Sequence, residues 1–241
     1  MVRYSLCKNK RKSGYPTGFF YFSKKFELNT GPKTSREIAS ALLEIGAIKL
    51  SPNEPFTWAS GWKSPIYCDN RLALSFPELR KRIKNELCSL VRQHYPNAEA
   101  IAGVATAGIP QGALVADALN LPFIYVRSKP KEHGLANQIE GRIVEGQKAV
   151  VIEDLVSTGS SSIAAALALR QSGISVIGML AIFSYQFDQA AVNFSSNGLE
   201  LHCLSTYTDL LAAARYAGSI DERQEALLTQ WRKNPAAWAQ H

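Results

Sequence analysis

The chain has 241 residues, 46% of them hydrophobic, and a formal net charge of +7. This length supports one substantial hydrophobic core and leaves no room for a second enzyme domain. The charge is uneven, because residues 1–33 hold eight Lys or Arg and one Glu, which leaves 19 basic and 19 acidic residues in the rest of the chain. A neutral body argues against a nucleic-acid-binding protein, so we expect no nucleic-acid partner.

The basic residues 1–33 show no sustained hydrophobic period and predict a disordered N-terminal extension without a catalytic role. Their apolar run, Phe19 to Phe22, is too short for a signal peptide or a membrane span, so we expect no membrane association. An organelle transit peptide and an arm for anionic surfaces remain alternatives. The four cysteines are widely spaced and form no paired motif, which favours a reducing, cytoplasmic location.

The folded domain is expected to begin at Thr34. Thr34 and Glu37 have the spacing of a capping box, and the apolar residues after them predict a helix that stops at Gly46. Residues 51–65 are rich in Pro, Ser and Gly and predict an irregular loop, which leads into an extended segment at Ile66–Cys68.

A helix is predicted from Pro77, and from residue 100 onward apolar strands alternate with helices. The apolar runs are continuous, which indicates strands covered on both faces and a doubly wound α/β domain with a mainly parallel sheet flanked by helices. From Thr208 through Trp231 the chain is predicted to be helical, with Trp231 and Trp238 as packing or interface residues. The predicted strands are Ala100–Val104, Phe123–Arg127, Ala149–Leu155 and Ser175–Phe183, with predicted helices near 109–119 and 160–172.

The run from Val150 to Ser161 carries the most chemical information. An apolar strand ends in Glu153 and Asp154, and a Ser/Thr/Gly turn then opens a helix. The free N–H groups at a helix N-terminus and the hydroxyl groups of the turn are suited to binding a phosphate. The carboxylates would repel that phosphate and are suited to vicinal sugar hydroxyls, or to a sugar bound with a divalent metal. A phosphorylated ribose satisfies both halves, whereas a solvated strand end and an ordinary helix cap are the structural alternative.

Three other segments extend this candidate site. The small-residue turn Thr106–Pro110 lets backbone amides approach an anion. Residues Arg127–Gly134, here called the flap, hold several cations and a histidine, which predicts a mobile loop that closes on a polyanion. Residues 56–67 contain two Trp among small residues and are suited to covering a flat heterocycle. A structural turn, a solvated charge run and core packing are the respective alternatives.

With these segments in this order, the chain resembles the orotate phosphoribosyltransferases, a family of type I phosphoribosyltransferases. The resemblance rests on Ser60 to Asp69, on the flap and on Glu153 to Ser161. It implies the type I phosphoribosyltransferase fold as a single domain over residues 34–241, with a small N-terminal hood at about residues 34–75. It also implies transfer of the ribose 5-phosphate group of phosphoribosyl pyrophosphate to orotate in de novo pyrimidine (UMP) biosynthesis, with Mg²⁺ as cofactor. Family members are commonly homodimers in which the flap of one subunit closes over the other's site.

The resemblance implies roles for individual residues as well. Glu153 and Asp154 are expected to hold the ribose hydroxyls, and together with Lys131 they are the expected catalytic residues. Mg²⁺ is expected to bind mainly through the substrate, with no protein ligand assigned. The expected contacts of orotate are Ser157, Tyr67 and Cys68, and those of phosphoribosyl pyrophosphate are Arg127, Lys131, His133, Glu153, Asp154, Leu155, Val156, Ser157, Thr158, Gly159, Ser160 and Ser161.

Some positions depart from the pattern of better-known family members. Ala59, Ala107 and Ser128 stand where such members carry a Lys. Tyr185 stands at the place of an Arg that binds the carboxylate of orotate. Lys63 or backbone amides of the hood are candidate substitutes for that Arg.

Two alternative functions remain open at this point. One is a phosphoribosyltransferase for another base, such as uracil or xanthine. The other is a non-catalytic regulator that senses phosphoribosyl pyrophosphate and binds DNA. The regulator would need a DNA-reading module, and residues 1–33 show no helix-turn-helix pattern.

Overall fold

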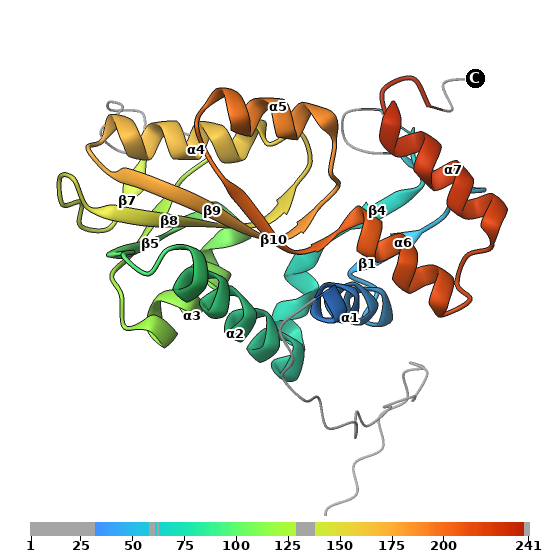
Figure 1. The fold of residues 1–241 in the computed structure, drawn as a ribbon, viewed down its shortest axis with the longest axis horizontal. Helices are drawn as coiled ribbons and strands as arrows, with labels where there is room; N and C mark the ends of the chain where they lie inside the picture. Colours follow the sequence, from blue (N-terminus) through green and yellow to red (C-terminus); the bar gives the residue numbers. More distant parts are fainter. Residues whose placement is uncertain (1–31, 58–60, 62, 129–137, 239–241) are drawn as a thin grey trace, which may run out of the picture.

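The computed structural model describes residues 32–57, 61, 63–128 and 138–238. A six-stranded sheet with the order β10-β9-β8-β5-β6-β7 forms its centre (Figure 1). Neighbouring strands run parallel from β10 to β6, and β7 is antiparallel to β6, so the sheet is mainly parallel as predicted. The strands are β5 (Ala100–Val104), β6 (Phe123–Val126), β7 (Ile139–Glu140), β8 (Lys148–Val156), β9 (Ser175–Ser184) and β10 (Leu201–Thr206).

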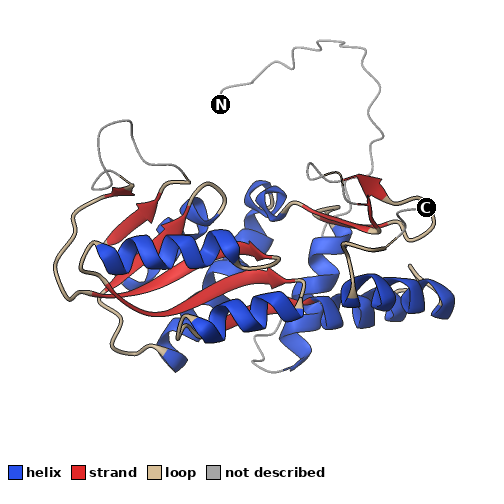
Figure 2. Ribbon diagram, turned by 90° about the horizontal axis from the view of Figure 1, so that it is seen from above, coloured by secondary structure: helices blue, strands red, loops and turns tan. Residues whose placement is uncertain are grey.

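Helices cover both faces of this sheet (Figures 1 and 2). Along β8, Val150 and Ile152 belong to one hydrophobic core, and Ala149 and Val151 belong to the core on the opposite face. Because both faces are buried, the strands are continuous apolar runs, and this is why the sequence predicts them well. The first face is covered by α2 (Pro77–His94) and α3 (Gly108–Leu119), and the second by α4 (Ser160–Gln171) and α5 (Asp188–Ser196).

The predicted hood packs beside the β10 edge of the sheet. Its first helix contacts α6 and β10, and two antiparallel strand pairs follow, β1 with β4 and β2 with β3. A 3₁₀ helix, η1, then contacts β8 and leads into α2. The elements are α1 (Pro32–Glu44), β1 (Ile48–Leu50), β2 (Phe56–Thr57), β3 (Lys63–Ser64), β4 (Ile66–Cys68), η1 (Asn70–Ser75) and α6 (Tyr207–Tyr216).

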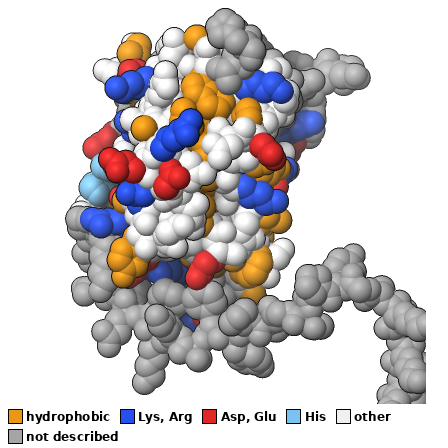
Figure 3. Space-filling view, turned by 90° about the vertical axis from the view of Figure 1, so that its right-hand side faces the viewer, with side chains coloured by type: hydrophobic (Ala, Val, Ile, Leu, Met, Phe, Trp, Pro, Cys, Tyr) orange, Lys and Arg blue, Asp and Glu red, His pale blue; other side chains and the backbone are white. Residues whose placement is uncertain are grey.

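The C-terminal helices α6 and α7 (Glu222–Lys233) close the structure at the hood end through an aromatic cluster. The ring of Trp231 is completely buried, and its centroid lies 5.8, 5.4 and 5.6 Å from those of Tyr185, Phe187 and Tyr207. The outer surface at this end carries charged side chains of both signs interspersed with small apolar areas (Figure 3). Within the described part of the chain, no helix combines the length and hydrophobicity that crossing a bilayer requires.

Two local predictions about the hood are wrong. Helix α1 begins at Pro32, so Thr34 is a helical residue and not the cap, and the carboxylate of Glu37 pairs with Arg82 of α2. Residues 51–65 are not wholly irregular, because β2 and β3 pair within them. Strands of two residues are too short to show a hydrophobic period, which is why the sequence did not indicate them.

The burial of Trp231 leads to a stability prediction. We expect Trp231→Ala to lower the free energy of unfolding by about 3–5 kcal/mol, because the substitution opens a cavity among three other aromatic rings. Trp238→Ala is the matched control, since Trp238 is only partly buried against the same core and should cost about 1 kcal/mol or less. Urea unfolding measures both values, and equal losses would contradict the central role of Trp231.

Candidate functional site

The loops that follow β5 and β8 meet at the carboxyl edge of the sheet, where ligands bind in folds of this kind. The turn after β5 contains a cis peptide bond between Ala105 and Thr106 and leads into α3 at Gly108. A Cβ atom on Gly108 would lie 2.4 Å from the carbonyl oxygen of Ile152 in β8. Only glycine therefore allows this turn to pack directly against β8, beside the acidic residues that end the strand.

The turn between β8 and α4 leaves the N-terminus of α4 open. Gly159 is the N-cap residue with a φ of 77°, and no side-chain hydrogen bond caps the helix within the described residues. Ser160 and Ser161 are exposed, and the hydroxyl oxygens of Thr158 and Ser160 lie 3.1 Å apart. Uncapped N–H groups surrounded by hydroxyl groups are suited to binding a phosphate.

Helix α5 supports this turn from outside the motif. The side-chain amide of Asn193 donates a hydrogen bond to the carbonyl oxygen of Thr158 at 2.8 Å. The ring of Phe194 lies 2.7 Å from the position of a Cβ atom on Gly159, so this glycine is required by space as well as by its positive φ. The sequence does not indicate this role of Asn193, because a contact across 35 positions leaves no local pattern.

Glu153 and Asp154 end the strand with different surroundings. The carboxylate of Glu153 is buried and accepts hydrogen bonds from the hydroxyl of Ser162 and from the backbone N–H of Asp154, both at 3.1 Å. Burial and the neighbouring charge of Asp154 raise the pKa of Glu153 to about 8. Burial also raises the pKa of Asp154. The sequence-based prediction treated both side chains as ionised carboxylates. The raised pKa values indicate that the pair carries less negative charge than that at neutral pH.

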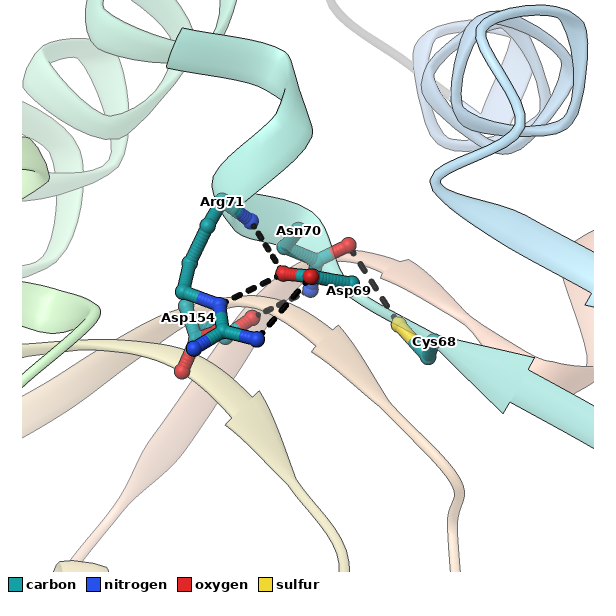
Figure 4. Close-up of polar contacts among 5 residues, drawn as sticks. All are labelled: Cys68, Asp69, Asn70, Arg71 and Asp154. Atoms are coloured by element: carbon teal, nitrogen blue, oxygen red, sulfur yellow. Dashed lines mark hydrogen bonds and ion pairs between the residues drawn. The ribbon is translucent and has the colours of Figure 1, made fainter.

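The hood is joined to this acidic pair by Asn70 (Figure 4). The buried side-chain amide of Asn70 donates to the carbonyl oxygen of Asp154 at 2.8 Å, and the thiol of Cys68 donates to the amide oxygen of Asn70 at 3.4 Å. Burial, followed by the charges of Asp154 and Asp69, raises the pKa of the Cys68 thiol, so it remains protonated. Tyr67, which is 40% exposed, directly precedes Cys68 in β4. The hydrogen bonds from Cys68 through Asn70 to Asp154 therefore bring both predicted orotate-binding residues of β4 to the end of β8.

The flap is described only at its first two residues. Arg127 follows β6, its backbone N–H donates to the carbonyl oxygen of Gln138 at 2.8 Å, and its guanidinium Nη1 lies 3.7 Å from a carboxylate oxygen of Glu140. Lys131 and His133 lie outside the described residues, as do Trp58, Ala59, Ser60 and Trp62 of the hood. Leu155, Val156 and Ser157 connect the acidic pair to the turn before α4, with Val156 buried and Leu155 and Ser157 half-buried.

The raised pKa of Glu153 predicts a dependence of stability on pH. Because the pKa is higher in the folded state than the ordinary value of 4.5, the folded protein binds the proton more tightly, and stability falls as pH rises from about 4.5 to about 8. Glu153→Gln is neutral at every pH and avoids this loss. We expect its melting temperature to exceed that of the wild type by several degrees at pH 8.5 and to match it closely at pH 5.

Thermal unfolding of both proteins across this pH range tests the prediction. Glu44→Gln, at the exposed end of α1, controls for the loss of a surface carboxylate. A difference between Glu153→Gln and the wild type that stays constant from pH 5 to pH 8.5 would show that the Glu153 proton does not contribute.

Comparison with known proteins identifies the family. A model of the phosphoribosyl transferase domain matches residues 78–194. The chain is 55% identical over 204 residues to an orotate phosphoribosyltransferase of Cytophaga hutchinsonii, covering 85% of this chain and 98% of the relative, and 52% identical over 206 residues to one of Enterococcus faecalis, covering 86% and 98%. The solved orotate phosphoribosyltransferase of Aeropyrum pernix superposes with a TM-score of 0.66 at 27% identity, covering 76% of this chain and 99% of that one. The chain shares 52–55% identity with two of these relatives over most of its length and has an acidic strand end beside an open helix N-terminus. It therefore belongs to the orotate phosphoribosyltransferase family.

Proposed function

We propose that this protein transfers the ribose 5-phosphate group of phosphoribosyl pyrophosphate to orotate, giving orotidine 5′-monophosphate and pyrophosphate in de novo pyrimidine biosynthesis. One observation carries the proposal: the acidic pair Glu153 and Asp154, the open N-terminus of α4 and the hood residue Asn70 all meet at the end of β8. A phosphate, a ribose and a base can therefore be held side by side.

Each part of this site has a proposed role. The turn from Ser157 to Ser161 binds the 5′-phosphate through backbone N–H and hydroxyl groups. Glu153 and Asp154 bind the ribose hydroxyls, and the remaining negative charge on the pair stabilises the positive charge that develops on the ribose ring. Tyr67 and Cys68 contact orotate through their backbone, and Ser157 contacts it from the other side.

The pyrophosphate group is proposed to bind through Arg127, Lys131 and His133 together with Mg²⁺. Within the described part of the chain, no three His, Cys, Asp or Glu side chains gather around a metal position. Mg²⁺ often binds through one or two carboxylates and the phosphates of a substrate, so the half-buried Asp154 next to an open phosphate site fits this mode. When bound, Mg²⁺ neutralises negative charge on the departing pyrophosphate.

The assembly and location follow from the same proposal. We propose a homodimer in which the flap of one subunit closes over the site of the other, excluding water that would compete with orotate. A cytoplasmic location suits the dispersed cysteines, of which Cys68, Cys88 and Cys203 are free thiols.

An absorbance assay tests the substrate assignment. The full chain is supplied with phosphoribosyl pyrophosphate, Mg²⁺ and one base at a time, and consumption of orotate but not of uracil or xanthine is expected. Turnover of xanthine or uracil without orotate would reassign the base. Sequence-specific DNA binding without any turnover would instead support the regulator.

A second prediction concerns the flap. We expect Lys131→Ala to lower kcat by about two orders of magnitude, because it removes a positive charge that stabilises the departing pyrophosphate. Lys129→Ala, which removes a neighbouring flap charge with no proposed contact, is the matched control and should have a much smaller effect. If the Lys131→Ala enzyme turned over as fast as the wild type, Lys131 would have no part in the mechanism.

A further inference from the structure

The proposed site so far lacks a cation that would bind the carboxylate of orotate. This carboxylate is attached to the ring carbon next to the nitrogen that bonds to the ribose, so a cation that binds this group must lie close to the ribose-binding acids. Tyr185 cannot supply the contact, because its side chain is only 3% exposed and stacks against Phe187 with ring centroids 5.4 Å apart. The side chain at this position belongs to the core.

Arg71 lies where such a cation is needed. It follows Asn70, the residue that joins the hood to Asp154, and Figure 4 shows its guanidinium group in front of Asp154. Burial raises the pKa of Asp154, and the positive charge of Arg71 acts on it in the opposite direction, so the two groups are close in space. The Arg71 side chain is 61% exposed and thus open to a ligand.

The guanidinium group is held in place by one of its edges. Nε donates to Oδ1 of Asp69 at 2.6 Å and Nη2 donates to Oδ2 at 2.9 Å. Within the described residues, Nη1 has no hydrogen-bond acceptor. Since guanidinium has a second planar edge between its two terminal nitrogens, Asp69 orients Arg71 and leaves a fork of N–H donors that matches a carboxylate.

We propose that Arg71 is the specificity-determining residue that binds the carboxylate of orotate. The inference rests on the proposed function and adds the residue that distinguishes orotate from uracil, which lacks this carboxylate. Two other cations of this region already donate hydrogen bonds to groups of the protein. Lys63 donates to the hydroxyl of Thr57 at 3.0 Å, and Arg80 donates to the carbonyl oxygen of Leu74 at 2.7 Å.

Steady-state kinetics of Arg71→Gln test the proposal. We expect kcat/KM for orotate to fall by about 10- to 100-fold, the size of a lost charge-assisted bidentate contact, while KM for phosphoribosyl pyrophosphate changes little. The amide of orotate, a neutral molecule of nearly the same shape, serves as a competitive inhibitor, and its inhibition constant should be nearly unchanged. Arg71→Lys keeps the charge without the planar fork and should give an intermediate loss.

Two matched variants complete the experiment. Arg92→Gln removes an exposed charge at the end of α2 and should behave as the wild type, whereas Lys63→Gln tests the rival cation of the hood. Equal weakening of orotate and its amide in Arg71→Gln would overturn the proposal, since it would indicate a structural role for the Asp69–Arg71 pair. A loss confined to Lys63→Gln would overturn it in favour of Lys63. If the wild-type enzyme were inactive with orotate, the proposed function itself would be refuted. The results with the variants bear only on the role of Arg71.

Discussion

The chemistry that we propose for this protein depends on the placement of two acidic side chains at the end of a strand that is enclosed on both faces. Helices cover both sides of β8, so Glu153 is only 5% exposed and its carboxylate accepts a hydrogen bond from the hydroxyl of Ser162. Holding two ionised carboxylates at such a position is costly, and burial together with the charge of Asp154 raises the pKa of Glu153, which favours its protonated form. An acidic pair with reduced charge can lie next to the proposed phosphate site, which two full charges would disfavour.

The second requirement is that the base and the ribose meet at a fixed distance. The hood and β8 are far apart in sequence, and the Asn70 hydrogen bond to the carbonyl of Asp154 joins residues separated by 84 positions. Because the donor is a buried side chain and the acceptor is backbone, the link is independent of the protonation state of the Asp154 carboxylate. The hood can therefore keep its position while the charge of the acidic pair changes.

The sequence was informative where the chemistry is local. Strand β8, its acidic end and the turn before α4 form one continuous segment, so each was predicted from neighbouring residues. The supports of that segment were not, because Asn70, Ser162 and Asn193 act through contacts made only after folding. The capping box at Thr34 was also wrong, because α1 begins at Pro32 and the carboxylate of Glu37 pairs with Arg82 of α2, a contact that no local pattern reveals.

The pairing of Arg71 with Asp69 also bears on how one site separates several anions. A free arginine beside the phosphate site would attract pyrophosphate and 5′-phosphate, which carry more charge than a carboxylate. Asp69 cancels most of the long-range attraction of Arg71, whereas short-range hydrogen bonds from the second edge of the guanidinium remain available. Under the proposed assignment, selection depends on shape at contact distance, which favours the planar carboxylate of a base over a phosphate.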